Sequence, residues 1–383
     1  MDIYVLDKNF KRIHIIDQYK SLIWANRYNE IGDCELMINA TVDNWFVFKD
    51  GIYLIREDDD MVCRIEKLNI KTDLENGNFI IITGYDIKNI LKQRIIWKQT
   101  NFNGLAEDYI RKLIEEAIIS PELTTRKINN FILDDKNGFL DEIQQQVTYD
   151  NLQEKITEIC KKYEWGYKVY IDNELIRFKL YKGEDRSDYV IFTEDYENLA
   201  ETEYIEDKSN IRNVALIAGE GEGVERTIAT TGDKSGLERY ELYVDARDLS
   251  KKIEYEDLKN TYKNGEEKTI DGKTYYVVDD VNIAILVKED DYTDVELLDA
   301  VYVNNLISKG NESLAQYCNT KTFNGSVETK TTFEYKKDYF LGDVVSVKNQ
   351  YGISIMARIV EIIEVDDDNG YSVEPKFEYM EVN

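Results

Sequence analysis

Turn residues divide this sequence into short β-rich segments, and this pattern most restricts how the chain can fold. Only two prolines, Pro121 and Pro375, occur in 383 residues, so most turns must be made by Gly, Asn and Asp. Asn-Gly and Asp-Gly tolerate the positive φ angles of tight hairpin turns. These pairs stand at Asn76-Gly77, Asn137-Gly138, Asp271-Gly272 and Asn369-Gly370. The flanking runs predict hairpins from 61–70 to 79–83 and from 353–365 to 371–377, and the run 275–278 indicates a third.

Strand signals dominate the first 95 or so residues, and helix signals follow them. Strands are predicted at 2–6, 13–16, 22–25, 35–38 and 53–56, spaced as in small sandwiches or barrels. Three amphipathic helices are predicted: one capped by Asn103 and ending before Pro121, one capped by Asp150, and one opened by the capping box Thr293-Asp294-Val295-Glu296. Further strands are expected at 167–171, 175–180, 213–218, 239–244 and 326–333.

Residues 51–86 and 342–379 resemble each other in the order of their segments. Each begins with Gly and a short strand, continues through a long strand containing Arg-Ile, and returns after an Asn-Gly turn. Arg64-Ile65 in the first copy matches Arg358-Ile359 in the second. Two interpretations stay open, because any two hairpins share such a layout, whereas two related β-domains at the two ends of the chain would also produce it.

Composition excludes several classes of protein. With 48 Lys and Arg against 76 Asp and Glu, the net charge is −28, which argues against nonspecific binding of nucleic acid. A hydrophobic content of 43% and an aromatic content of 12% exclude a disordered chain. No run reaches the ~18–20 apolar residues of a membrane helix, and the N-terminus lacks the pattern of a signal peptide. A soluble protein with no membrane anchor is expected.

The cysteines Cys34, Cys63, Cys160 and Cys318 are scattered and form no Cys-x-x-Cys pair. We therefore expect four reduced, buried thiols in a protein made in a reducing cytoplasm. With one histidine, His14, the chain has no zinc-ligand cluster.

Searches for catalytic motifs give weak candidates only. His14 lies in an alternating segment and has no Gly-x-Ser-x-Gly partner motif. Residues 219–223 read Gly-Glu-Gly-Glu-Gly after a strand, but the carboxylates would repel a phosphate, so a loop is the better interpretation. The acidic runs 57–60 and 366–370 read better as solvated hairpin loops than as calcium sites. No catalytic, cofactor-binding or metal-binding residue is predicted.

A series of motifs runs along nearly the whole chain: Ile3-Tyr4-Val5-Leu6-Asp7, Ser21-Leu22-Ile23-Trp24, Arg27-Tyr28-Asn29-Glu30-Ile31-Gly32-Asp33, Gly51-Ile52-Tyr53-Leu54-Ile55-Arg56, Gly84-Tyr85-Asp86, Arg94-Ile95-Ile96-Trp97, Asn213-Val214-Ala215, Val244-Asp245-Ala246-Arg247-Asp248-Leu249 and Leu341-Gly342-Asp343-Val344-Val345. In their order, these motifs resemble the tail-tip or baseplate hub proteins of long-tailed phages and phage-tail-like particles.

The resemblance implies an α+β, mostly β fold with two related small β-barrel domains and helix-containing insertion domains between them. We expect an N-terminal barrel at 1–96, an α/β insertion at 97–204, a second barrel at 205–245 plus 325–383, and a helix-bearing insertion at 246–324. The expected function is structural rather than enzymatic. Three subunits would form a pseudo-sixfold ring that joins the six-fold tail tube to the tip.

The same resemblance implies the partners. These are two further copies of the chain, a distal tail ring or tube protein, the tape measure protein, and a tip spike or fibre protein. DNA would pass through an acidic channel without specific binding. The sequence ends at Asn383 directly after the last predicted strand, so a spike or lytic module is expected on another polypeptide. The expected location is the virion tail tip.

Four aromatic residues are candidates for contacts between subunits: Trp24, Tyr28, Trp97 and Tyr339. Burial in the core is the alternative for each. A cell-wall glycosidase, for which the many acids offer carboxylate pairs, and a β-rich carbohydrate-binding module are the alternative functions.

Overall fold

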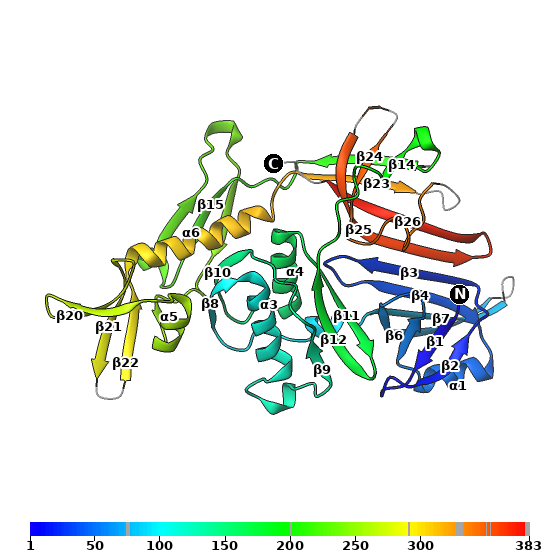
Figure 1. Ribbon diagram of the computed structural model, residues 1–383, viewed down its shortest axis with the longest axis horizontal. Coiled ribbons are helices and arrows are strands. Elements are labelled where there is room, and N and C mark those ends of the chain that lie inside the picture. The colour runs from blue at the N-terminus through cyan, green and yellow to red at the C-terminus, as the bar shows by residue number, and fades with distance from the viewer. Residues whose placement is uncertain are drawn as a thin grey trace.

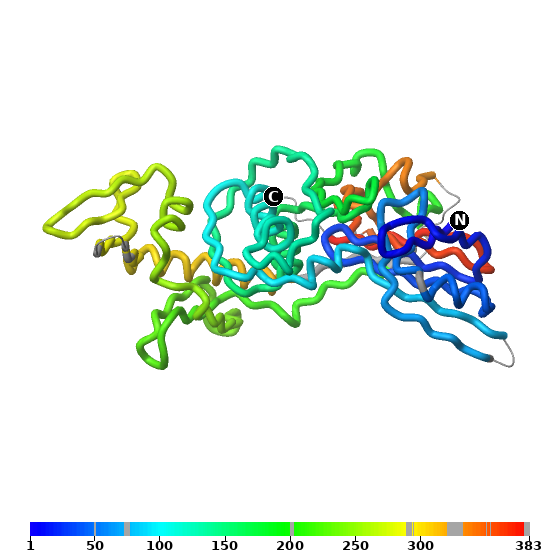
Figure 2. Tube along the Cα trace, turned by 90° about the horizontal axis from the view of Figure 1, so that it is seen from below, coloured from blue at the N-terminus to red at the C-terminus, as the bar shows by residue number. Residues whose placement is uncertain are grey.

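The computed structural model describes residues 1–73, 77–199, 201–289, 292–326, 332–349, 351–352 and 354–379. Within these residues, strands from both ends of the chain form one 13-stranded sheet (Figure 1). The part between the ends leaves this sheet and forms smaller sheets and helices, which extend to the opposite end of an elongated molecule (Figure 2). The fold is therefore mostly β, as predicted from the sequence.

The first module of the large sheet comes from the N-terminal part of the chain. Alternating side chains of its strands face inward, among them Leu22 and Trp24 on β3 and Leu36 and Ile38 on β4, and all four are buried. The module contains β1 (Ile3–Leu6), β2 (Arg12–Ile16), β3 (Ser21–Arg27), β4 (Asp33–Asn39), helix α1 (Val42–Asp50), β5 (Tyr53–Arg56), β6 (Val62–Asp73) and β7 (Gly77–Asp86). The predicted hairpin joins β6 to β7, and Asn76 of its turn lies outside the described residues.

The second module comes mainly from the C-terminal part of the chain. Its core contains Phe192, Tyr339, Val345, Ile359 and Phe377, all buried. The module contains β13 (Ile191–Thr193), β14 (Glu201–Asp207), β23 (Thr320–Ser326), β24 (Val344–Lys348), β25 (Ser354–Asp367) and β26 (Gly370–Tyr379). The predicted C-terminal hairpin is the antiparallel pair β25 and β26, with Asn369-Gly370 at its turn.

The two modules repeat one pattern of strand pairing. The first has the order β3-β4-β7-β6-β5, and the second has the order β14-β23-β26-β25-β24. Each long strand carries a bulge at the same place, between Ile65 and Lys67 in β6 and between Ile359 and Glu361 in β25. The repeat suspected from the sequence is thus present in the sheet. Among the described residues the strand order is an open path from β14 to β2, so the sheet itself gives no two closed barrels.

The first insertion packs three helices against short sheets. Ile110, Ile114, Ile156 and Trp165 are buried at the centre of its core. Its elements are α2 (Asn89–Lys92), β8 (Thr100–Leu105), α3 (Ala106–Ile114), the π-helical turn η1 (Glu115–Ile119), the short turn η2 (Thr124–Arg126), β9 (Phe131–Leu133), β10 (Glu142–Val147), α4 (Leu152–Tyr163), β11 (Gly166–Asp172), β12 (Leu175–Tyr181) and the turn η3 (Glu194–Tyr196).

Two predicted helix starts in this region are wrong. Residues 100–105 form β8, paired with β10, so Asn103 lies in a strand and α3 begins at Ala106. The next helix is capped by Asn151 rather than Asp150, because the Asn151 side chain accepts bonds from the backbone N–H of Gln153 and Glu154.

The second insertion combines a three-stranded and a five-stranded sheet with helix α6. Ile217, Val244, Leu286, Tyr302 and Leu306 are buried in its core. Its elements are β15 (Val214–Ala218), η4 (Gly223–Glu225), β16 (Ile228–Thr231), η5 (Gly236–Glu238), β17 (Glu241–Asp245), β18 (Lys252–Ile253), α5 (Tyr255–Thr261), β19 (Glu266–Ile270), β20 (Lys273–Val278), β21 (Val281–Glu289), β22 (Tyr292–Leu297) and α6 (Asp299–Ala315).

The capping box predicted at Thr293-Asp294-Val295-Glu296 is also wrong. These residues lie in β22, which pairs with β21, and the helix begins only at Asp299. The local pattern Thr-Asp-Val-Glu-Leu alternates, and Val295 and Leu297 are buried on one face, which suits a half-buried strand.

The sheets cut across three of the four expected domain ranges, since β23 of the large sheet also extends into the range 246–324. Strand β14, expected in the insertion 97–204, spans its boundary and belongs to the large sheet, while β15 to β17, expected in the second barrel, pack with α6 in the core of the second insertion. The ranges 1–96, 97–204, 205–245 plus 325–383, and 246–324 stay a prediction as independent domains.

The expectation of four reduced, buried thiols is wrong for three of them. Cys34 and Cys63 form a disulfide with a Cα–Cα distance of 6.4 Å, and Cys318 is exposed, so only Cys160 is a buried free thiol. The bonded residues lie on β4 and β6, the two neighbours of β7. A Cβ on Gly84 of β7 would come within 2.7 Å of the Cys63 sulfur, so the glycine provides the space for this sulfur.

Tyr28, directly after β3, is the point at which both modules and the first insertion meet. Its ring is fully buried, its hydroxyl donates to the carbonyl of Glu164 at 3.0 Å, and its backbone N–H donates to Val360 at 2.9 Å. The backbone of Gly342 passes directly over the ring, where a Cβ would come within 2.3 Å of a ring carbon. This close approach requires glycine, whose φ here is +98°.

We expect Gly342→Ala to destabilise the protein more than Gly352→Ala. Both glycines have positive φ, +98° and +80°, but a Cβ on Gly352 meets no atom within 4 Å. Both variants place a side chain at a positive φ angle and so share that backbone strain, but only Gly342→Ala adds a collision with the ring of Tyr28. Chemical denaturation should give a free energy of unfolding lower by about 1–3 kcal/mol for Gly342→Ala than for Gly352→Ala. Equal losses would contradict the packing described for Tyr28.

Candidate assembly interface

One strand pair joins the two modules into a single sheet. Strand β25 of the second module pairs antiparallel with β3 of the first, from Glu361 opposite Arg27 to Asp367 opposite Ser21 (Figure 1). The strands come from opposite ends of the sequence, so no local turn holds them together. Their register must therefore be set by the side chains that meet across the junction.

Ion pairs reinforce this junction from both faces of the sheet. Arg27 contacts Glu361 at 2.6 Å, and the fully buried guanidinium of Arg56 contacts Glu364 of β25. Lys336, from the second module, lies 3.2 Å from Glu364 and 2.9 Å from Asp59. Buried charges are stable only when they are paired, so these contacts favour one relative position of the modules.

Asp58, in the turn between β5 and β6, belongs to the same network. Partial burial alone would raise the pKa of its carboxyl group. Hydrogen bonding and charge attraction from Arg56, together with Lys336, instead hold this pKa down at about 2.

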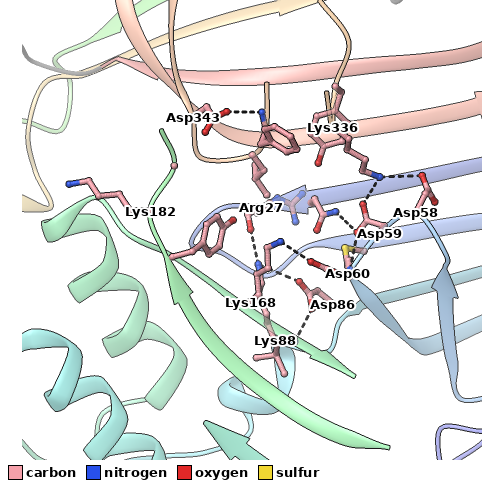
Figure 3. A pocket seen from close by; sticks show the side chains of 18 of the residues that line it. Arg27, Asp58, Asp59, Asp60, Asp86, Lys88, Lys168, Lys182, Lys336 and Asp343 are labelled. Carbon is pink, nitrogen blue, oxygen red and sulfur yellow. Dashed lines mark hydrogen bonds and ion pairs between the residues drawn. The ribbon is translucent and has the colours of Figure 1, made fainter. Parts of the chain in front are cut away.

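A cavity of about 760 Å³ lies beside the junction, where the modules meet the first insertion (Figure 3). Acidic and basic side chains line it together. Lys168 on β11 contacts Asp60 at 2.9 Å, and Arg186 contacts Asp343 at 2.7 Å. These pairs connect different parts of the chain, so the cavity is a polar seam between folded units.

Asp86 and Lys88 form a buried pair at one side of this seam. Their charged atoms are 3.4 Å apart, and Lys88 also donates to the carbonyl oxygens of Arg27 and Glu30 at 2.7 and 3.1 Å. Burial raises the pKa of Asp86 and lowers the pKa of Lys88. Through Arg27, this pair holds the end of β3 against the loop after β7.

Several strand edges of the large sheet remain open within the described chain, and two of them occupy positions equivalent to those of β3 and β25 in the junction between the modules. Strand β14 ends the sheet and pairs only with β23, and the part of β6 from 67 to 73 pairs only with β7. Both edges are solvent-accessible, with Ile70 49% and Ile205 41% exposed. An open edge presents unpaired backbone N–H and C=O groups, which can bind another strand.

The structure places the four aromatic interface candidates differently. Trp24, Tyr28 and Tyr339 are buried within the chain, so the core alternative describes them. Trp97 is 46% exposed, and the guanidinium of Arg126 lies 5.0 Å from its ring centre. Only for Trp97 does a contact with another subunit stay a prediction.

The weak chemical motifs occupy structural positions. Residues 219–223 lead from β15 through η4 into the antiparallel strand β16, and Arg226 donates to the Gly219 carbonyl oxygen at 2.8 Å. His14 lies on β2 and is exposed. In the part of the chain that the structure describes, no group of three or more His, Cys, Asp and Glu residues could hold a metal ion. None of the described helices is long and apolar enough to cross a membrane.

Sequence reasoning did not identify the open edges as a site. The sequence signal that bears on them is the similarity of residues 51–86 to residues 342–379, because the first segment contains β6 and the second contains its counterpart β25. It did not contain β14, whose sequence Glu-Thr-Glu-Tyr-Ile-Glu-Asp shares no residue at any matching position with that of β3.

A family model described as Siphovirus ReqiPepy6 Gp37-like protein matches residues 2–377. No curated protein matches the chain.

Several solved structures of tail proteins share the fold. A tail protein from Neisseria meningitidis MC58 has a TM-score of 0.53 at 10% identity and covers 98% of this chain and 95% of its own. The prophage MuSo2 43 kDa tail protein from Shewanella oneidensis has a TM-score of 0.53 at 10% identity, covering 98% of each chain. The prophage tail protein gp18 from Listeria monocytogenes EGD-e has a TM-score of 0.50 at 13% identity, covering 100% and 96%.

The Asp58 contact predicts how stability depends on pH. Because its pKa falls from the ordinary 3.8 to about 2 on folding, the carboxylate stabilises the protein above pH 4. This contribution should disappear as the pH falls from about 4 to about 2. At pH 7, Asp58→Asn should therefore unfold more easily than the unmodified protein, and the difference should shrink towards pH 2. Urea denaturation across this range measures it, and a difference that does not change with pH would contradict the role of Asp58.

Proposed function

Because the chain belongs to the Siphovirus ReqiPepy6 Gp37-like family, and its fold is that of several tail proteins, we propose that it is a structural hub of a phage tail tip. Three subunits form a ring at the tip. In this role the protein works by assembling with copies of itself and with neighbouring tail proteins, rather than by catalysis.

The observation that carries this proposal is the repeated module, in which the open edges of β14 and β6 correspond to β3 and β25 of the internal junction. Inside the chain, the junction of β3 with β25 shows how one module joins the next. The outer edge of β14 is equivalent to that of β3, and the edge of β6 from 67 to 73 is equivalent to that of β25. Neither has a neighbour among the described strands. An interface between two different edges is heterologous, and such interfaces produce closed rings when the rotation between subunits closes.

Three subunits with two modules each give a ring of six similar units. Such a ring matches the symmetry of a six-fold tail tube and distal ring above it. In the proposed hub, the ring continues the tube as two related β-units per subunit. The tape measure protein and a tip spike or fibre protein are its other partners.

The proposed trimer has a simple test. Light scattering coupled to size exclusion should give a mass three times the 44.9 kDa of one chain, maintained over a dilution series. The open edges are the physical reason, since burying them satisfies backbone groups in both partners. The mass of a single chain at every concentration would contradict the proposal.

The net charge of −28 suits a channel through which DNA slides without binding. Mixed with double-stranded DNA at about 0.1 M salt, the protein should leave the electrophoretic mobility of the DNA unchanged, since a net acidic surface repels a polyanion. Retarded DNA at this ionic strength would contradict free passage.

A further inference from the structure

The bulges allow the two modules to be aligned residue by residue. Strand β6 is irregular between Ile65 and Lys67, and β25 is irregular between Ile359 and Glu361. Arg64 and Arg358, just before the bulges, occupy the same position, each opposite the first residue of the short strand β5 or β24. Lys67 of the first module therefore corresponds to Glu361 of the second.

The alignment extends through the paired strands to the far side of each module. Following the observed registers, β7 corresponds to β26, β4 to β23, and β3 to β14. Strands β3 and β14 each contain seven residues and align without a gap. Arg27 at the end of β3 thus corresponds to Asp207 at the end of β14, and Ile23 corresponds to Glu203.

The junction inside the chain can now serve as a template for a junction between chains. In the observed junction, Glu361 lies opposite Arg27, Glu364 opposite Trp24, and Val365 opposite Ile23. Replacing each residue by its counterpart in the other module pairs β6 with β14. The resulting pairs are Lys67 with Asp207, Asn69 with Ile205, Ile70 with Tyr204, and Lys71 with Glu203.

Three of these four transposed pairs are chemically complementary. Arg27 and Glu361 form an ion pair in the observed junction, and their counterparts Asp207 and Lys67 also have opposite charges, with the signs exchanged. Lys71 opposite Glu203 adds a second pair of opposite charge, and the same register places Ile70 opposite Tyr204. Opposite charges and apolar pairs across antiparallel strands stabilise the pairing, whereas like charges oppose it.

Both lysines of the β6 edge agree with this register, whereas its last pair, Asp73 with Glu201, places two acids opposite each other. The β14 sequence Glu-Thr-Glu-Tyr-Ile-Glu-Asp contains four acidic residues and no basic one. The β6 sequence from 67 to 73, Lys-Leu-Asn-Ile-Lys-Thr-Asp, has both of its lysines at positions opposite acids. In a chain with many more acids than bases, this placement of lysines argues for an acidic partner strand.

We infer that β14 of one subunit pairs antiparallel with residues 67–73 of β6 in a second copy of this chain, with Lys67 opposite Asp207 and Lys71 opposite Glu203. This inference rests on the proposed ring and specifies its subunit contact. The large sheet then continues from subunit to subunit. Around the ring, the junction of β3 with β25 within a chain alternates with the junction of β14 with β6 between chains.

Disulfide crosslinking tests the register in the full-length chain. Directly opposed residues of antiparallel strands have Cα atoms ~4.5–5.5 Å apart, within the range of a disulfide. In a Cys318→Ser background, which removes the exposed free thiol, Asn69→Cys with Ile205→Cys should form covalent dimers and trimers under mild oxidation. The matched control, Asn69→Cys with Glu203→Cys, places the thiols two residues out of register and should crosslink far less.

A charge exchange tests the pair chemistry separately. Lys67→Asp places two acids opposite each other and should raise the concentration needed for assembly by about tenfold or more. Adding Asp207→Lys in the same chain should restore assembly. Lys179→Asp, the same change at an exposed position of β12 in another sheet, is the control and should assemble normally. Circular dichroism checks that each variant is folded.

The outcomes separate this inference from the proposed function. A trimer that crosslinks in register and recovers on charge exchange supports both. A trimer that crosslinks only with the control pair, or not at all, overturns the register and leaves the hub proposal standing. A chain that stays monomeric overturns the hub proposal and the inference with it.

Discussion

The pairing of β3 with β25 is the interaction on which the rest of the structure depends. It brings residues from the two ends of a 383-residue chain into adjacent positions of one sheet. The chain between them must then leave the sheet and return, which is why the insertions lie outside the β-modules (Figure 2). Closing so long a loop costs conformational entropy, and the ion pairs Arg27–Glu361 and Arg56–Glu364 with the buried ring of Tyr28 offset that cost at the junction.

This junction also suggests how the same pair of strand positions could join modules both within one chain and between two chains. Within the chain, covalent linkage keeps β3 and β25 at a high effective concentration, which favours their pairing. The junction can therefore include the buried ion pair of Glu364 with Arg56, whose charges must be taken out of water. The transposed edges lack this advantage, and they carry accessible lysines and acids instead. Charges at exposed edges keep strands from pairing indiscriminately, while a matched partner satisfies them. In the proposed ring, the same side chains would protect the free subunit and select its neighbour.

Much of the local fold could be predicted from the sequence, and the long-range pairings could not. The hairpins of β6 with β7 and β25 with β26 follow from alternating segments on either side of Asn-Gly, and the Arg-Ile repeat identified the two modules. The predicted helix starts at Asn103 and Thr293 are wrong because each segment pairs with another strand. The segment around Asn103 pairs with β10, which is distant in the sequence, and the segment around Thr293 pairs with β21. The Cys34–Cys63 bond and the burial of Trp24, Tyr28 and Tyr339 likewise depend on which strands become neighbours. The open edges could not be identified before the sheet order was known.

Electron cryo-microscopy of the assembled protein tests the central claim most directly, because it shows which strands meet at each subunit boundary. The account predicts a three-fold ring in which a continuous sheet crosses from β14 of one subunit to β6 of the next, at a place equivalent to the internal junction of β3 with β25. A ring with another number of subunits, or one whose subunits meet through the insertions while both edges stay exposed, would contradict it.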